Sequence, residues 1–255
     1  MTQDLFRQDA YLTQCAASVT AITEQGIVLD RTVFYPLGGG QAGDSGTLVL
    51  ADGTVLAIAD TRKGKDAEGH ATADIVHVPA PGQEEALARL KTGDTVTARI
   101  DWQRRHRLMR FHTATHLLCH LVPQLVNGCS ITPDYARLDF NMTDPLDKDT
   151  LTAGIARLVA AAHPLTVGEI TDAELDANPA LVKSMSVQPP RGSGRIRTIH
   201  IGSEALIDLQ PCGGTHVANT VEIGAVVVTK IEKKSATTRR VVLGFAPVAE
   251  PAAPQ

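Results

Sequence analysis

The pattern of apolar residues changes near Asp101, and this change limits what the chain can fold into. Before it, apolar residues form short β-branched runs separated by turn residues such as Ala51-Asp52-Gly53 and Thr92-Gly93-Asp94. Many short strands at this spacing predict a small barrel or sandwich. From Arg104 to Val122, apolar or small residues recur at helical spacing, which predicts one long helix ended or kinked by Pro123.

The remainder of the chain predicts an α+β domain over about residues 103–247. A second helix is expected from Lys148 to Ala162, where His163-Pro164 ends it. Strands are expected at Leu138–Phe140, Leu165–Ile170, Ile196–Ile201, Ala225–Ile231 and Val241–Phe245. The domains expected are therefore 1–102, rich in strands, and 103–247, α+β, followed by a disordered Pro/Ala-rich tail at 248–255.

Composition restricts the class of protein without naming a function. The 255 residues contain neither a signal peptide nor an apolar run long enough to cross a bilayer, so a cytoplasmic protein with no membrane partner is expected. Residues 1–100 carry 8 Lys/Arg and 13 Asp/Glu, whereas residues 101–255 carry 16 and 15. Any nucleic-acid surface should therefore be a local patch in the second half. The four cysteines are too irregularly spaced for a disulfide framework: Cys15, Cys119, Cys129 and Cys212.

Two short motifs carry metal-binding chemistry. His112-Thr-Ala-Thr-His116 places two imidazoles on one face of the predicted helix, and Cys212-Gly-Gly-Thr-His216 places a thiolate and an imidazole around a Gly-rich turn. Three His and one Cys form a nitrogen and sulfur set that suits Zn²⁺. Either pair alone is more often a packing feature, and the residues leave that interpretation open. A metalloprotease is disfavoured, because Thr113 stands where its general base would be Glu.

Together the motifs resemble the editing domain shared by alanyl-tRNA synthetases and the stand-alone alanyl-tRNA editing proteins of the AlaX family, to which a domain of threonyl-tRNA synthetase is related. The resemblance covers roughly residues 30–245 and is similar to the medium-length type. Its segments, in the family's order, are Phe34-Tyr-Pro-Leu-Gly-Gly-Gly-Gln-Ala-Gly-Asp-Ser-Gly46, Ile131-Thr-Pro-Asp134 with Leu138-Asp-Phe140, Asp208-Leu-Gln-Pro-Cys-Gly-Gly-Thr-His216, Glu222-Ile-Gly224, and Lys230 to Arg240. Two departures are Leu37, where an acidic residue is frequent, and the absence of glycines before Arg239-Arg240.

The resemblance implies a small N-terminal β-barrel joined to an α+β editing domain, with one Zn²⁺ per chain. It implies a trans-editing deacylase, a hydrolase that removes serine, and also glycine, from mischarged alanine tRNA. The expected metal ligands are His112, His116, Cys212 and His216, of which the two helix histidines are also expected to be catalytic. Thr132 is the candidate contact for the serine hydroxyl, while a turn-closing role before Pro133 remains open. The expected partner is alanine tRNA carrying serine or glycine, and no DNA partner is expected. The protein is expected to be a monomer or a weak homodimer.

Further substrate and tRNA contacts are expected on two segments. Gly39, Gly40, Gln41 and Asp44 belong to a Gly-rich loop that either reaches the editing site or only makes a tight turn. Lys233, Lys234 and Arg239 belong to a basic cluster suited to phosphate contacts, although charge runs are usually solvated. Four protein ligands also describe a closed structural zinc site, so a non-catalytic, zinc-stapled tRNA-binding or synthetase-associated module remains the alternative.

Overall fold

The computed structural model describes residues 2–189, 194–203 and 205–247. Their contacts divide the chain into two compact units. Unit 1 comprises residues 1–112, 130–133 and 211–217, and unit 2 comprises 113–129, 134–210 and 218–255. The expected boundary at residue 102 is where the helix α2 (Trp102–Leu121) begins, but two later segments pack with the first unit. The expected disordered tail at 248–255 lies outside the described residues.

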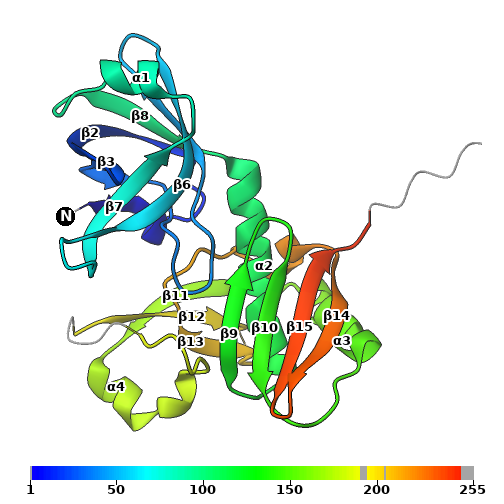
Figure 1. Cartoon of the computed structure of the whole chain (residues 1–255). Coiled ribbons are helices and arrows are strands. Elements are labelled where there is room, and N and C mark those ends of the chain that lie inside the picture. Colours follow the sequence, from blue (N-terminus) through cyan, green and yellow to red (C-terminus); the bar gives the residue numbers. More distant parts are fainter. Residues whose placement is uncertain (1, 190–193, 204, 248–255) are drawn as a thin grey trace, which may run out of the picture. The chain divides into compact units, whose positions relative to one another are not determined.

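Six strands of unit 1 pair in a closed ring in the order β2-β3-β7-β6-β5-β8 (Figure 1). Each pair is antiparallel, so the expected succession of short strands and turns forms a barrel. The strands are β2 (Gln14–Thr23), β3 (Gly26–Leu29), β5 (Gly46–Leu50), β6 (Val55–Lys65), β7 (Ala71–Pro79) and β8 (Thr95–Ile100). A short parallel pair, β1 (Gln3–Asp4) with β4 (Arg31–Thr32), and the helix α1 (Glu84–Arg89) complete this part.

Alternating apolar residues of the barrel strands fill its interior. Leu48, Leu56 and Ala98 are fully buried there, and Val19 and Val96 are nearly so. The exposed or half-exposed residues between them face outward, as expected for strands with one buried face. The barrel therefore has its own apolar core.

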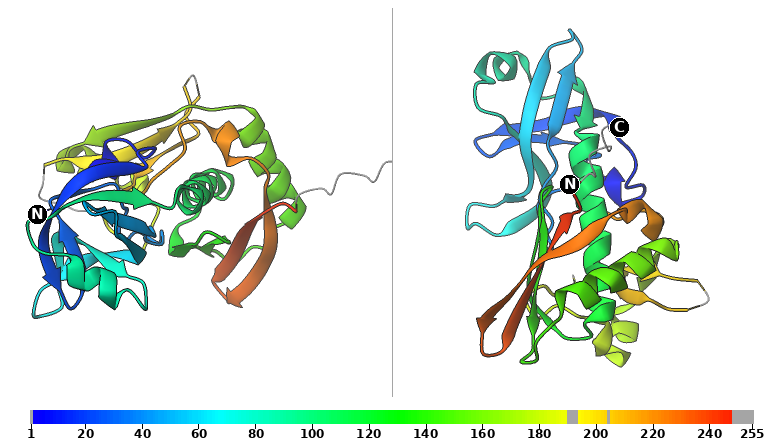
Figure 2. Two further views of the ribbon diagram at one scale, coloured as in Figure 1. Left: turned by 90° about the horizontal axis from the view of Figure 1, so that it is seen from above. Right: turned by 90° about the vertical axis from the view of Figure 1, so that its right-hand side faces the viewer.

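Unit 2 is built mainly from two sheets and the helix α3 (Lys148–Ala160), which the sequence placed at 148–162. The four-stranded sheet has the order β14-β15-β10-β9, and the three-stranded sheet has the order β11-β12-β13. Helix α3 packs against β14, as Figures 1 and 2 show. The strand bounds are β9 (Val126–Ile131), β10 (Ala136–Asn141), β11 (Leu165–Ile170), β12 (Ile196–Ile201), β13 (Asp208–Pro211), β14 (Val226–Ser235) and β15 (Thr238–Phe245). The helix α4 (Asp172–Ala177) and the short 3₁₀ turns η1 (Leu5–Arg7), η2 (Pro179–Leu181) and η3 (Thr220–Ile223) complete the described elements.

Helix α2 starts in unit 1 and continues in unit 2 without interruption. Its spacing predicted one apolar stripe, but residues 111–119 are all buried. Four of them are polar, namely His112, Thr113, Thr115 and His116. Buried polar groups are costly unless they have partners, so this stretch of helix requires a polar site around it.

Candidate metal centre

The two helix histidines lie one turn apart and are almost fully buried. His112 is 6% exposed and His116 is 3% exposed. Their four-residue spacing in an unbroken helix directs both imidazoles to the same side. The first requirement of the predicted metal site is therefore met by the local geometry of α2.

The Cys212–His216 turn supplies the other two side chains. It follows β13, and Cys212 Sγ lies 3.4 Å from His112 Nε2 and 3.3 Å from His216 Nε2. The rings of His112 and His216 are 4.2 Å apart between centroids. One potential ligand atom from each of His112, His116, Cys212 and His216 lies within 4.8 Å of the others. The structure thus brings together the four residues that the sequence singled out.

Gly214 allows this turn to approach the helix closely. A Cβ atom at this position would lie 2.1 Å from His112 Cε1 and 2.4 Å from His112 Nδ1. Such distances are far below van der Waals contact, so a side chain here would displace the ring. The glycine is therefore required by space and not by a left-handed backbone, since its φ is not among the positive values.

The Nδ1 atom of each helix histidine has an acceptor. His112 Nδ1 lies 2.7 Å from Gln41 Oε1, and His116 Nδ1 lies 2.8 Å from Asp208 Oδ2. The Asp208 carboxylate also accepts hydrogen bonds from Lys183 Nζ and Gln210 Nε2. Burial would raise the pKa of Asp208, but the hydrogen bond from His116 and the nearby Lys183 lower that pKa.

The donor set fits a zinc ion. An acceptor at Nδ1 leaves Nε2 of His112 and His116 as the nitrogen that can bind metal, which is the usual arrangement of zinc-binding histidines. Three imidazole nitrogens and one thiolate within one small cluster match the ligands and number of tetrahedral zinc. The half-buried Cys212 is the most accessible of the four.

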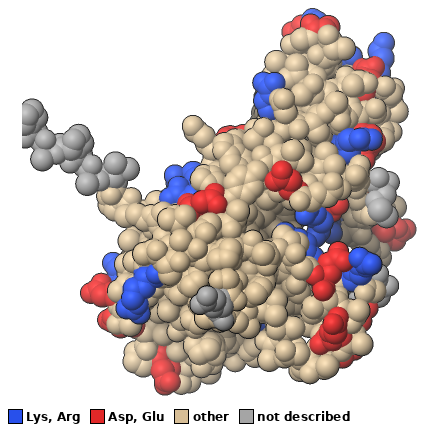
Figure 3. Space-filling view, turned by 180° about the vertical axis from the view of Figure 1, so that it is seen from behind, with Lys and Arg blue, Asp and Glu red and all other residues tan. Residues whose placement is uncertain are grey.

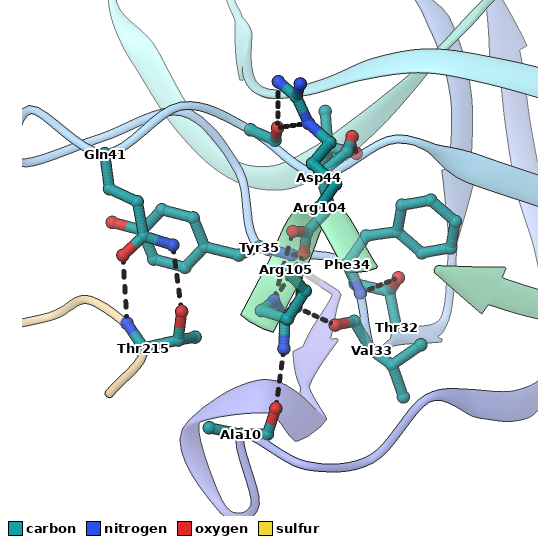
Figure 4. Close-up of polar contacts among 12 residues, drawn as sticks. Ala10, Thr32, Val33, Phe34, Tyr35, Gln41, Asp44, Arg104, Arg105 and Thr215 are labelled. Carbon is teal, nitrogen blue, oxygen red and sulfur yellow. Dashed lines mark hydrogen bonds and ion pairs between the residues drawn. The ribbon is translucent and has the colours of Figure 1, made fainter. Parts of the chain in front are cut away.

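The Gly-rich loop is fixed at both ends inside unit 1 (Figure 4). Gly39 and Gly40 have φ values of +59° and +88° and form the turn between Gly38 and Gln41. Gln41 is fully buried, and its amide contacts Thr215 as well as His112. The structure therefore makes the loop a tight turn that also reaches the metal cluster.

Asp44, at the far end of the loop, is also fully buried. Its carboxylate pairs with Arg105 of α2 and accepts a hydrogen bond from the backbone N–H of Tyr35 at 2.6 Å. Arg105 in turn donates to the carbonyl groups of Ala10 and Val33. The hydrogen bonds of Asp44 therefore hold the loop to the first turn of the helix.

Thr132 follows β9 directly and is half-buried. The preceding residue, Ile131, donates its backbone N–H to the carbonyl of Gly40 at 2.8 Å and accepts from the N–H of Ala42 at 3.0 Å. Thr132 thus leaves the strand beside the tip of the Gly-rich loop.

The basic residues near the end of the chain divide into two groups. Lys233 and Lys234 are exposed on β14. Arg239 is 8% exposed, and its guanidinium donates to the backbone carbonyls of Ser235 and Thr143. The structure brings Arg239 into the β14–β15 hairpin and leaves the two lysines at the surface.

Sequence reasoning missed the partners of the helix histidines. Asp208, Gln210 and Cys212 are spaced by two residues, and alternate residues of a strand point to one side. Assigning β13 from the sequence would have placed the Asp208 and Gln210 side chains together. The contact of Gln41 with His112 spans 71 residues of sequence and had no comparable local signal.

Comparisons with known proteins identify the family of the chain. A model described as the threonyl and alanyl tRNA synthetase second additional domain matches residues 196–242, and one described as class II (A) tRNA synthetases matches residues 7–104. The chain is 33% identical to the alanyl-tRNA editing protein AlaX-M of Saccharolobus solfataricus, over 94% of this chain and 98% of that protein. It is 31% identical to AlaX-M of Methanosarcina acetivorans, over 94% and 97%. It is 34% identical to the alanine–tRNA ligase of Metallosphaera sedula, over 91% of this chain but 25% of the ligase. The chain therefore belongs to the family of the AlaX-M alanyl-tRNA editing proteins.

Proposed function

We propose that this protein is a trans-acting aminoacyl-tRNA deacylase that hydrolyses the ester linking a wrongly attached serine, and also glycine, to alanine tRNA. The observation that carries the proposal is the cluster of three His and one Cys. Three of these residues, His112, Cys212 and His216, belong to unit 1, which also contains Thr132 and the Gly-rich loop. The names of the relatives support editing of alanyl-tRNA, and their match over nearly their whole length supports action outside a synthetase.

The proposed substrates follow from the limits of binding specificity. The pocket of an enzyme that attaches alanine to tRNA cannot strongly reject serine, which adds a hydroxyl, or glycine, which lacks a methyl group. A second hydrolytic site that hydrogen-bonds the serine hydroxyl rejects alanine, because its polar groups would be left unpaired. Thr132 is our candidate for this contact, since its half-buried side chain follows the strand end bonded to Gly40.

The metal centre provides the chemistry of the proposed reaction. When bound, zinc would act as a Lewis acid that polarises the ester carbonyl or water. His112, His116, Cys212 and His216 would hold it, and Cys212 is the most accessible of the four. A set of four protein ligands also suits a structural zinc, which keeps the non-catalytic tRNA-binding module as the second candidate.

The tRNA backbone is proposed to contact exposed lysines of unit 2. Lys233 and Lys234 are consecutive exposed residues of β14. The face drawn in Figure 3 shows Lys and Arg interspersed with Asp and Glu and has no broad basic surface. No helix among the described residues is both long and apolar enough to pass through a membrane.

The decisive experiment compares release of three amino acids from the same tRNA. Purified protein is incubated with alanine tRNA carrying labelled serine, glycine or alanine, and the remaining ester is measured with time. We expect rapid loss of serine, loss of glycine and retention of alanine. Cys212→Ala removes a ligand and should reduce release to the uncatalysed rate. Cys15→Ala removes a half-buried thiol from β2 and is the matched control.

Zinc content and tRNA binding are measured on the same samples. If neither wild type nor Cys212→Ala releases serine while wild type binds tRNA and zinc, the deacylase is refuted and the binding module stands. If Cys212→Ala retains zinc and full activity, the ligand set is wrong.

A further inference from the structure

The amide of Gln41 has only one orientation that satisfies its neighbours. The backbone N–H of Thr215, which can only donate, lies 3.2 Å from Gln41 Oε1, and Gln41 Nε2 lies 2.9 Å from Thr215 Oγ1 (Figure 4). Rotating the amide by 180° would place two donors, its NH₂ group and the Thr215 N–H, against each other. The atom that faces the Thr215 backbone is therefore the oxygen.

This orientation determines the tautomer of His112. The same Oε1 atom lies 2.7 Å from His112 Nδ1, and an oxygen acceptor requires a proton on that nitrogen. The neutral ring then has its lone pair on Nε2, the atom that lies 3.4 Å from Cys212 Sγ. A backbone amide of the Cys212–His216 turn thus dictates, through Gln41, which nitrogen of His112 is free to bind a metal ion.

We propose that Gln41 is a positioning residue of the metal centre, which fixes His112 as the Nδ1–H tautomer and joins it to the Cys212–His216 turn. Gln41 is fully buried, and both polar atoms of its amide are used within the protein. It therefore acts on the ligand and not on the substrate. The inference rests on the metal site of the proposed function but is independent of whether that site hydrolyses an ester.

The other histidine that α2 contributes to the cluster, His116, allows two kinds of acceptor at Nδ1 to be compared within the same site. His116 has a carboxylate acceptor, Asp208, at the same ring nitrogen, whereas His112 has a neutral amide. A carboxylate makes a histidine ligand more basic than an amide does. A carboxylate in place of Gln41 should therefore keep the tautomer and bind zinc at least as well as the amide.

The test measures Zn²⁺ affinity of the full-length protein, stripped of metal and titrated against a chromogenic chelator. Gln41→Met keeps the length of the side chain and removes the acceptor, so its zinc affinity should fall by about 10- to 100-fold. Gln41→Glu keeps an acceptor for both His112 and the Thr215 N–H, and the Thr215 hydroxyl can donate to its second oxygen. Its affinity should equal or exceed that of wild type.

A role in packing alone predicts the reverse order, because Glu places a charge in a fully buried position and Met does not. Wild-type affinity in Gln41→Met, or an equal loss in both variants, would overturn the proposal.

A second measurement uses only the wild-type protein and so does not depend on the folding of a variant. Long-range proton–nitrogen NMR spectra of the zinc-loaded protein distinguish protonated from metal-bound ring nitrogens, and the ring signals of His112 are assigned through its own backbone resonances. We expect His112 to carry its proton on Nδ1 and the metal on Nε2. Metal on Nδ1 would refute the inference. A protein that shows the expected spectrum but releases no serine would instead refute only the deacylase.

Discussion

Replacing Gly214 by Ala tests the geometry of the metal centre with a single methyl group. The new Cβ would lie 2.1 Å from His112 Cε1, so reaching an ordinary contact of about 3.4 Å requires the ring to move by about 1.3 Å. The Cβ would also lie 2.9 Å from Gln41 Oε1, which blocks an escape toward that side chain. Zinc–ligand distances tolerate only about ±0.2 Å. We expect zinc affinity to fall by at least about 100-fold, since a ligand itself is displaced.

The assay is competition for Zn²⁺ with a chromogenic chelator, together with circular dichroism to verify folding. Gly213→Ala is the matched control, because its Cβ would meet nothing closer than Arg7 Nη1 at 3.4 Å, the end of a flexible side chain. Neither glycine has a positive φ among the described residues, so the two variants differ in contact and not in backbone strain. Wild-type affinity in Gly214→Ala would refute the reasoning. An equal loss in Gly213→Ala would assign the effect to the turn's backbone.

Three further outcomes are expected. The double charge reversal Lys233→Glu with Lys234→Glu should weaken tRNA binding and lower the slope of log K against log[salt] by up to about 2. The control, Lys91→Glu with Lys148→Glu, changes the net charge equally at two other exposed lysines and should have neither effect. Equal effects of the two double variants would assign the result to the overall charge. Burial lowers the pKa of His77 from 6.5 to about 4, so the unfolded chain binds more protons between these values and stability is lost as pH falls through them. Urea unfolding of metal-free protein at pH 7 and pH 5 should show about 2 kcal/mol more loss in wild type than in His77→Gln, and parallel losses would exclude His77 as the cause. Zinc at about 100 times its Kd should stabilise the protein by about 2.7 kcal/mol, read as a higher Tm that chelator reverses; an unchanged Tm would contradict metal binding to the folded state.

The elements with a strong local period were predicted well. The helix expected at 104–122 is α2 at Trp102–Leu121, and the one expected at 148–162 is α3 at Lys148–Ala160. Strand β9 was missed because Asn127-Gly128 is typical of a turn, yet pairing with β10 holds these residues in a sheet. Such pairing is a tertiary effect that overrides local propensity.

The site could be predicted where chemistry is concentrated in short motifs. The His and Cys pairs indicated a metal cluster because their residue types and spacing suit one, and the structure brings them together. Their distant partners had no such signal. Gln41 and Asp44 were interpreted as substrate or tRNA contacts, with a tight turn as the alternative; the structure buries both, and a role toward the substrate stays a prediction. A sequence shows which side chains can bind a ligand, and only the fold shows which way an amide or carboxylate turns.

The two attachments of the Gly-rich loop to α2 set a strict register. Arg105 holds Asp44 and His112 contacts Gln41, and these helix positions are seven residues apart, which is close to two full turns. One inserted residue between them would rotate His112 by about 100° relative to Arg105 and advance it by about 1.5 Å. The Arg105–Asp44 ion pair and the His112–Gln41 hydrogen bond could then not form at the same time. Insertions and deletions should therefore be absent from this stretch of helix in working members of the family, however freely the surface loops change in length.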